Sequence, residues 1–325
     1  MADLAWYCDL GRAFVPCLRA GQYAPANWFE DAHRGYGQHV HVADRAVDHL
    51  DLADPILTAK LILITDLHIT SAGEPIIGLD PEVRLRTVLD HALTHHSDAD
   101  AIVLMGDLTH YGLPDQYAQL AGILADVPIL VIPMLGNHDR RDAFVDQFGG
   151  PTDGNGFVQH ILDLPTHRVI TLDTLDGPPY PTGHHAGRLC PQRMQWLSDA
   201  LADLGDRTPL IIAHHPPFDT GIVGMDAIKL QDGAALLATI APYPNAHLVC
   251  GHMHRTISGT TQGVGWSMLK STCHQGVLDL INPDSSLSVD EPASCGVALL
   301  SNGSTVIHSQ DVGFKGEILR DGHSA

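Results

Sequence analysis

The chain has 325 residues, of which 44% are hydrophobic and 17% charged, as is typical of a globular protein with ample material for a core. Its 18 Lys and Arg residues stand against 38 Asp and Glu residues, and the formal net charge of −20 disfavours nucleic acid as a partner. The N-terminus lacks the basic start and apolar run of a signal peptide, and no apolar stretch reaches about 18 residues. We therefore expect a cytoplasmic protein without a membrane partner.

Residues 1–58 show no clean hydrophobic period, and we treat them as an N-terminal extension of unknown role. Beyond them, short apolar runs recur that are too short for independent helices. They are rich in Ile, Val and Leu, as expected for strands buried on both faces. The runs are "LILITD" (61–66), "AIVLMGD" (101–107), "ILVIPML" (129–135), "RVITLD" (168–173), "LIIAHH" (210–215) and "HLVCG" (247–251).

Helical patterns lie between these runs, at 81–96, which opens on Pro81, and at 190–205. Strands that alternate with helices predict an α/β architecture. After about residue 264 the pattern changes, and 296–310 is typical of two strands joined through Asn302 and Gly303. We therefore expect a core at 59–263, and C-terminal strands with a cap or oligomerisation segment at 264–325 that complete the same domain.

Polar residues follow five of the six predicted strands. The carboxyl ends of strands in an open α/β sheet border the crevice where ligands bind, so these side chains are expected to meet there. Residues two apart in an extended segment point the same way, which lets one segment aim two ligands at one point. The residues are Asp66 and His68, then Gly106 and Asp107, then Gly136, Asn137, His138 and Asp139, then His214 and His215, and finally Gly251, His252 and His254.

Mixed carboxylate, amide and imidazole ligands suit Mn, Fe, Zn or Co. They differ from the all-oxygen ligands typical of a magnesium site and from the thiolates of a thiolate-rich zinc site. Two divalent ions bridged by one carboxylate would polarise a phosphoryl group and supply hydroxide at neutral pH. Each motif alone is also typical of a turn, a cap or a buried histidine. All five in chain order, each at a strand end, favour a dinuclear metal site.

These five motifs resemble the signature blocks of the calcineurin-like metallophosphoesterase superfamily, over about residues 61 to 260. Within it, the chain resembles the class III cyclic nucleotide phosphodiesterase and glycerophosphodiesterase branch. The stretches that carry this narrower resemblance are "HHPPFDTGIVGMD" (214–226), "TCHQGVLDL" (272–280) and "EPASCGVALL" (291–300). The resemblance implies a four-layer α-β-β-α sandwich with two mixed sheets.

The resemblance also implies roles for individual residues. One metal would be held by Asp66, His68, Asp107 and His254, and the second by Asp107, Asn137, His214 and His252. His138 would face the phosphate, stabilising negative charge or protonating the leaving oxygen, and Asp139 would orient His138.

Further histidines are candidates for substrate contacts, namely His110, His215, His274 and the pair His184 and His185. Each has an equally simple interpretation as a solvated or internally hydrogen-bonded loop residue. The phosphoprotein phosphatase branch carries an arginine shortly after its Gly-Asp motif, where this chain reads "GDLTHYG" (106–112). A phosphoprotein substrate is therefore disfavoured.

The resemblance predicts a hydrolase in which a metal-bound hydroxide attacks a phosphodiester in line. The substrate could be a 3′,5′-cyclic nucleotide, a glycerophosphodiester, or a phosphonate or phosphotriester. A phosphomonoesterase or nucleotidase of the same superfamily is the alternative, and an inactive metal-binding scaffold is a further one. The resemblance of 264–300 to a cap predicts a homo-oligomer, a dimer or larger.

Overall fold

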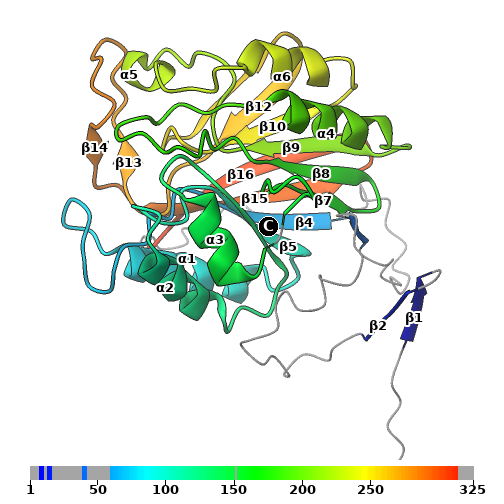
Figure 1. Ribbon diagram of the computed structural model, residues 1–325, viewed down its shortest axis with the longest axis horizontal. Helices are drawn as coiled ribbons and strands as arrows, with labels where there is room; N and C mark the ends of the chain where they lie inside the picture. The colour runs from blue at the N-terminus through cyan, green and yellow to red at the C-terminus, as the bar shows by residue number, and fades with distance from the viewer. Residues whose placement is uncertain (1–6, 11–12, 17–38, 42–58, 151, 314–325) are drawn as a thin grey trace, which may run out of the picture.

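The computed structural model describes residues 7–10, 13–16, 39–41, 59–150 and 152–313 (Figure 1). Most of the predicted N-terminal extension, and the last residues of the predicted C-terminal segment, lie outside these ranges. Among the described residues, no helix combines the length and apolarity needed to cross a bilayer.

Two mixed sheets form the centre of the molecule. The five-stranded sheet has the order β16-β15-β4-β5-β6, with β4, β5 and β6 parallel and β15 antiparallel to both of its neighbours. Its strands are β4 (Ala59–Ile64), β5 (Ala101–Met105), β6 (Val131–Met134), β15 (Ala293–Ser301) and β16 (Ser304–Val312). The predicted hairpin is thus present, and β15 lies inside the sheet beside β4.

The seven-stranded sheet has the order β11-β12-β10-β9-β8-β7-β3, with a parallel centre from β12 to β8. Its strands are β3 (His39–His41), β7 (His160–Asp163), β8 (His167–Leu172), β9 (Thr208–Ala213), β10 (His247–Cys250), β11 (Ile257–Thr261) and β12 (Val264–Met268). Two small two-stranded sheets pair β1 (Tyr7–Leu10) with β2 (Ala13–Pro16), and β13 (Gln275–Gly276) with β14 (Ser288–Val289).

Helices cover the outer face of each sheet, so the molecule has four layers (Figure 1). The helices are α1 (Pro81–His95), α2 (Pro114–Leu124), α3 (Arg141–Phe148), α4 (Pro191–Ala202), α5 (Val223–Asp226) and α6 (Gly233–Ile240). Helix α1 begins as the sequence predicts, with the Asp80 carboxylate accepting from the Val83 N–H and Pro81 in the first turn.

Three apolar clusters fill the three spaces between these layers. One packs Leu85 and Leu120 of α1 and α2 against β4 and β5, and another packs Leu197 and Leu237 of α4 and α6 against the seven-stranded sheet. The third lies between the sheets, where Leu63 shares a cluster with Leu210 and its neighbours. Strands buried on both faces explain the continuous apolar runs in the sequence. The α/β fold with two mixed sheets is confirmed.

Candidate metal centre and substrate pocket

The first two predicted ligand segments run side by side after β4 and β5. The Asp66 N–H donates to the Gly106 carbonyl at 3.1 Å, and the His68 N–H donates to the Asp107 carbonyl at 2.8 Å. These two bonds continue the parallel pairing past the strand ends. They bring three side chains, from Asp66, His68 and Asp107, to one edge of the sheet.

Five predicted metal ligands adopt the left-handed backbone region that residues other than glycine rarely occupy. The φ angles are 54° for Asp66, 50° for His68, 47° for Asp107, 67° for His252 and 51° for His254. The described residues contain only three other non-glycine residues with positive φ. Such conformations cost free energy and gather at functional sites, which makes this edge the strongest functional candidate.

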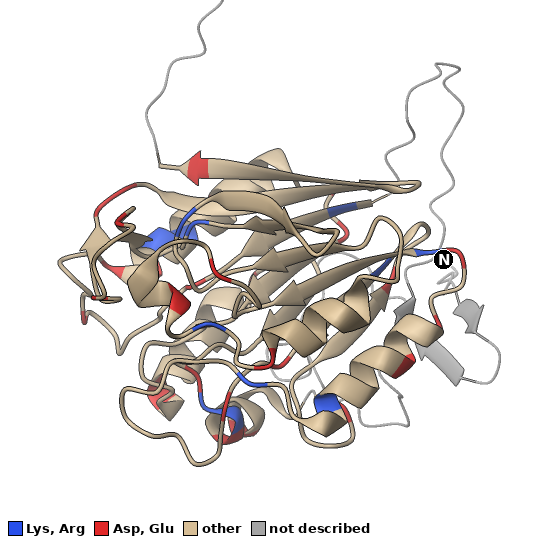
Figure 2. Ribbon diagram, turned by 90° about the horizontal axis from the view of Figure 1, so that it is seen from above, with Lys and Arg blue, Asp and Glu red and all other residues tan. Residues whose placement is uncertain are grey.

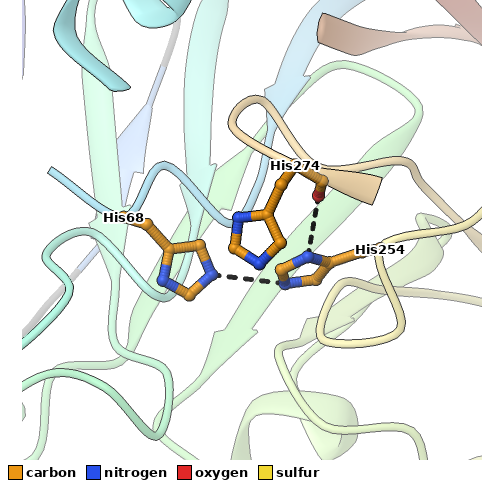
Figure 3. A group of neighbouring side chains, drawn as sticks. All are labelled: His68, His254 and His274. Atoms are coloured by element: carbon orange, nitrogen blue, oxygen red, sulfur yellow. Dashed lines mark hydrogen bonds between the residues drawn. The ribbon is translucent and has the colours of Figure 1, made fainter. Parts of the chain in front are cut away.

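The first predicted ligand group converges closely. Possible ligand atoms of Asp66, His68, Asp107 and His254 lie within 4.8 Å of one another. Nε2 of His254 is 3.2 Å from Nε2 of His68 (Figure 3). The same nitrogen is 3.1 Å from Oδ1 of Asp66. Nδ1 of His254 donates to the His274 carbonyl at 2.8 Å, which leaves its Nε2 lone pair for a cation.

The second predicted group surrounds the other side of Asp107. Oδ2 of Asp107 lies 3.2 Å from Nε2 of His214 and 3.8 Å from Nε2 of His68, so this carboxylate faces both groups. Nδ1 of His214 donates to the Met105 carbonyl at 2.9 Å, which again fixes the tautomer that leaves Nε2 as a ligand.

Unpaired buried atoms test whether these residues fit metal ions. Oδ1 of Asn137, Nε2 of His214 and Nε2 of His252 are all buried and form no hydrogen bond. Buried polar atoms are nearly always satisfied in a folded protein, so three neighbouring exceptions need an explanation. All three belong to the predicted second ligand group, and a divalent cation would satisfy them together. The residues therefore fit the two-ion site that the sequence predicts.

The charges around Asp107 favour a cation at this position. Burial opposes ionisation of the Asp107 carboxyl, but the neighbouring His214 and His138 hold its pKa well below the usual value. Burial likewise disfavours a charged His214, yet Asp107 and Asp66 raise its pKa to about 9. The carboxylates thus stabilise positive charge at the imidazole, in the place where a bound metal would supply that charge.

Gly136 lets the third segment approach the other two. A Cβ atom at this position would lie 2.2 Å from Oδ1 of Asp107 and 2.7 Å from Nε2 of His214. No side chain fits there, so glycine is required for Asn137 to lie beside both ligands. Similarly, a Cβ on Gly251 would lie 2.1 Å from Oγ1 of Thr65.

Asp139 differs from its predicted role of orienting His138. Its buried carboxylate accepts from the N–H groups of Leu108, Thr109 and Gly136 at 2.9–3.1 Å, and from the Tyr117 hydroxyl at 2.9 Å. The His138 ring instead uses Nδ1 to donate to the His110 carbonyl at 2.8 Å. Asp139 therefore joins the backbones that carry the ligands.

Four of the five motifs and three of the candidate substrate histidines line one pocket of about 370 Å³, whereas His214 and His215 are not among its lining residues. Two groups of polar residues line it. The first is His68, Asp107, His110, Asn137, His138, His185, His252, His254 and His274, and the second, from the loop between β13 and β14, is Asp279, Asn282, Asp284, Ser285, Ser286 and Ser288. Nδ1 of His274 is buried and unpaired, and the His274 ring lies 4.6 Å from the His254 ring, measured between centroids (Figure 3).

His215 does not belong to the pocket wall, contrary to the prediction that it binds substrate. Its ring is fully buried, with Nδ1 2.7 Å from Oγ1 of Thr174 and Nε2 donating to the His185 carbonyl at 3.1 Å. Both ring nitrogens are thus used inside the protein. A strand-end histidine packed against its neighbours gives the same sequence pattern as one that faces a ligand.

His185 has a more specific position than the sequence alone indicates. Nδ1 of His185 lies 3.0 Å from Nδ2 of Asn137, so it accepts from the amide whose oxygen is the candidate ligand. Its neighbour His184 pairs with Asp176 at 2.9 Å and is absent from the pocket wall. The contact joins residues 48 positions apart, and nothing in the local sequence could have predicted it.

The sequence model of the calcineurin-like phosphoesterase family matches residues 59–256, which contain every predicted metal ligand. The chain belongs to the calcineurin-like phosphoesterase family. Membership confirms the resemblance inferred from the five motifs. The matched range also contains the cluster of candidate ligands at the sheet edge.

Three relatives indicate the range of this family branch. A probable cyclic nucleotide phosphodiesterase of Rhodopseudomonas palustris is 35% identical over 263 residues, covering 80% of this chain and 95% of the relative. The glycerophosphodiester phosphodiesterase GpdQ of Enterobacter lignolyticus is 27% identical, covering 65% of this chain and 77% of its own. The 3′,5′-cyclic adenosine monophosphate phosphodiesterase CpdA of Escherichia coli is 26% identical, covering 66% and 77%.

Solved structures agree with the fold. A dimetal phosphatase of Danio rerio superposes with a TM-score of 0.58 at 17% identity, covering 79% of this chain and 97% of the other. The purple acid phosphatase PPD1 of yellow lupin gives 0.59 at 13% identity, covering 78% and 51%. At these identities the similarity concerns the fold alone.

Proposed function

We propose that this phosphoesterase hydrolyses phosphodiesters of the cyclic nucleotide or glycerophosphodiester type with two divalent cations. The observation that carries the proposal is the set of unpaired buried atoms on Asn137, His214 and His252 around the shared Asp107 carboxylate. The names of the relatives support the diester substrate, since both substrate types occur among them.

Two sets of residues, which share Asp107, form the two cation sites in this proposal. Asp66, His68, Asp107 and His254 hold one cation, and Asp107, Asn137, His214 and His252 hold the other. When bound, two divalent cations polarise the phosphoryl group and lower the pKa of a water molecule. Mn, Fe, Zn and Co all suit the mixed ligands.

His138 acts on the substrate side of the pocket. Its Nδ1 carries a proton, because the His110 carbonyl that it contacts can only accept a hydrogen bond. With Nδ1 bound to the carbonyl, Nε2 is the ring atom left for the substrate, and it donates to a phosphoryl oxygen or protonates the leaving oxygen when the ring carries a proton on both nitrogens. His110 and His274 flank it in the same pocket wall.

The partner is a small phosphoester, and the described surface supports this choice over nucleic acid. Along the ribbon, Lys and Arg residues are interspersed with Asp and Glu residues (Figure 2), and the full chain has 18 of the former against 38 of the latter. We further propose a cytoplasmic homo-oligomer, from the resemblance of 264–300 to a cap; within this range β12 and β15 belong to the two central sheets, which leaves the segment between them as the cap candidate. Light scattering that gives a single chain mass at micromolar concentration would contradict the oligomer.

The proposed reaction is tested with metal-stripped protein to which Mn²⁺, Fe²⁺, Co²⁺ or Zn²⁺ is added back. We expect metal-dependent cleavage of bis(p-nitrophenyl) phosphate in preference to p-nitrophenyl phosphate. The Asp107→Asn and Asn137→Ala variants should lose this activity while keeping the circular dichroism of the folded protein. Asp126→Asn, an exposed aspartate after α2, is the control that should retain it.

Two results would contradict the proposal. A preference for the monoester would identify a phosphomonoesterase. No cleavage with any metal, together with tight metal binding, would identify a metal-binding scaffold.

A further inference from the structure

Apolar side chains form a second part of the pocket wall, beside polar residues that the loop between β13 and β14 also contributes. Seven aliphatic side chains or methionines form the sides, and they come from three separate segments: the loop before α1, the segment around α5, and the loop between β13 and β14. They are Ile76, Ile77, Ile222, Met225, Ile228, Val277 and Leu287. An anionic phosphate group gains nothing from contact with apolar side chains. This wall must therefore contact another part of the ligand.

The apolar wall continues onto the outer rim. Ten large hydrophobic side chains are exposed in the described chain, and five of them belong to these segments. Their exposed fractions are 59% for Ile77, 48% for Val223, 61% for Leu278, 55% for Leu280 and 87% for Ile281. Apolar surface gathered around a pocket marks a binding surface, and Ile77, which also lines the pocket, joins this surface to the pocket wall.

The charged residues of the pocket restrict that occupant further. No lysine or arginine is among the described residues that line the pocket, whereas Asp279 and Asp284 of the β13–β14 loop are. An anionic group beyond the reacting phosphate would face these carboxylates without a compensating cation. An uncharged group would meet no such repulsion.

On the basis of the proposed phosphodiesterase function, we infer that the pocket selects diesters with an uncharged, largely apolar substituent of about the size of an aromatic ring. The metal-binding end takes the phosphate, and the aliphatic walls take the ring. Small polar substituents gain little from this wall, and substituents with a second negative charge are repelled. The inference thus favours aryl-like or nucleobase-like esters over glycerol esters.

The test compares p-nitrophenyl phosphodiesters that share one leaving group and differ in the second substituent. With metal-loaded protein, we expect kcat/KM for the phenyl ester to exceed that for the 3-hydroxypropyl ester by about tenfold, since the ring buries more apolar area. The 4-carboxyphenyl ester should be cleaved several-fold more slowly than the phenyl ester. Equal or faster cleavage of the 3-hydroxypropyl ester would overturn the inference.

Variants of the wall separate recognition from chemistry. Ile228 and Val277 are only half-buried, so Ile228→Asn and Val277→Asn should leave the core intact. We expect each to reduce the preference for phenyl over 3-hydroxypropyl several-fold, chiefly by lowering kcat/KM for the phenyl ester. Val306→Asn is the matched control, because Val306 is an exposed valine of β16 outside the pocket. An unchanged preference in both wall variants would overturn the inference.

The acidic residues give an independent test. Asp279→Asn and Asp284→Asn together should raise cleavage of the 4-carboxyphenyl ester relative to the phenyl ester. If the double variant leaves that ratio unchanged, the electrostatic part of the inference is wrong. Absence of turnover with every ester and every metal would instead refute the proposed function, and so the two failures are distinguishable.

Discussion

Nδ1 of His110 lies 3.2 Å from Nδ1 of His68, so a candidate metal ligand is hydrogen-bonded to a second imidazole. For His68 to offer Nε2 to a cation, its Nδ1 must carry the proton and donate it to His110. The equivalent nitrogens of His214 and His254 donate to backbone carbonyls, which no mutation of a side chain removes. His110 is therefore the replaceable support of one ligand.

We predict that His110→Ala weakens metal binding by about 10- to 100-fold, the usual effect of removing a partner of a metal-binding histidine. Competition with a chelating dye measures this affinity without any assay of activity. His184→Ala is the control, because His184 pairs with Asp176 away from the pocket wall. An unchanged affinity in His110→Ala would restrict His110 to a role in substrate binding.

Asp139 makes a second prediction, concerned with stability. An asparagine in its place keeps the shape but turns an NH2 group toward the N–H donors of Leu108 or Gly136. We expect Asp139→Asn to lower the free energy of unfolding by about 2–3 kcal/mol, because buried donors lose their acceptor. Urea denaturation measures the change, and Asp142→Asn, an exposed aspartate of α3, should stay within about 0.5 kcal/mol of the parent.

The different outcomes for Asp139 and Asn137 show what the sequence can and cannot predict. Asn137, Asp107 and His214 each follow a predicted strand, which was enough to predict that they lie at one edge. Parallel strands bring their carboxyl ends together whatever their side chains are. The direction in which Asp139 points depends on Tyr117, a residue of α2 that no local pattern connects with it. Strand ends are predictable for this reason, and hydrogen-bond partners across the fold are not.

The apolar pocket walls illustrate the same limit. Val277 lies in the stretch 272–280, which carries part of the resemblance to the family branch, and Ile228 lies just beyond the stretch 214–226, but an isolated aliphatic residue in a loop does not indicate a pocket wall. Only the packing of the segment around α5 against the β13–β14 loop brings the two into one pocket. Helices α2, α3 and α6 were also not predicted from the sequence. The predicted strands did not depend on them.

The third prediction concerns the effect of a larger side chain at position 136. A methyl group at this position would meet Asp107 and His214 at distances that no relaxed structure permits. We expect Gly136→Ala to cost about 1–3 kcal/mol of stability and to weaken metal binding, because the two ligands must move apart. Gly122→Ala is the matched control: this exposed glycine of α2 has open space around it, and alanine there should stabilise the protein by about 0.5–1 kcal/mol. Equal effects of the two substitutions would contradict this view of Gly136.

Removal of metal gives a fourth prediction. Cations that bind only the folded chain stabilise it, by about 2.7 kcal/mol at a concentration one hundred times the dissociation constant. We therefore expect EDTA to lower the melting temperature and Mn²⁺ or Zn²⁺ to restore it. Asn137→Ala should reduce this metal-dependent shift, whereas Asp126→Asn should keep it in full. A melting temperature insensitive to metal would argue against the two-ion site.

Acid should destabilise the fold partly through His167. This side chain is fully buried between the sheets, with its ring nitrogens close to the hydroxyls of Thr166 and Thr305. Burial lowers its pKa to about 4, from 6.5 in an unfolded chain. Because the folded state disfavours the proton, the contribution of a neutral His167 to stability is complete above pH 6.5 and is lost as the pH falls toward 4.

We predict that His167→Gln flattens this acid dependence. Unfolding of the parent chain takes up a proton at His167 between pH 6.5 and 4.5, and the variant lacks that uptake, so its free energy of unfolding should fall less steeply with acid. Urea titrations at both pH values, with a chelator present to remove any effect of metal release, measure the difference. His308→Gln, on the exposed side of β16, should follow the parent curve. If His167→Gln shows the same dependence on pH as the parent, its substitution changes the free energy of unfolding equally at every pH. The proton taken up in this range then belongs to the other buried histidines, and the prediction is wrong.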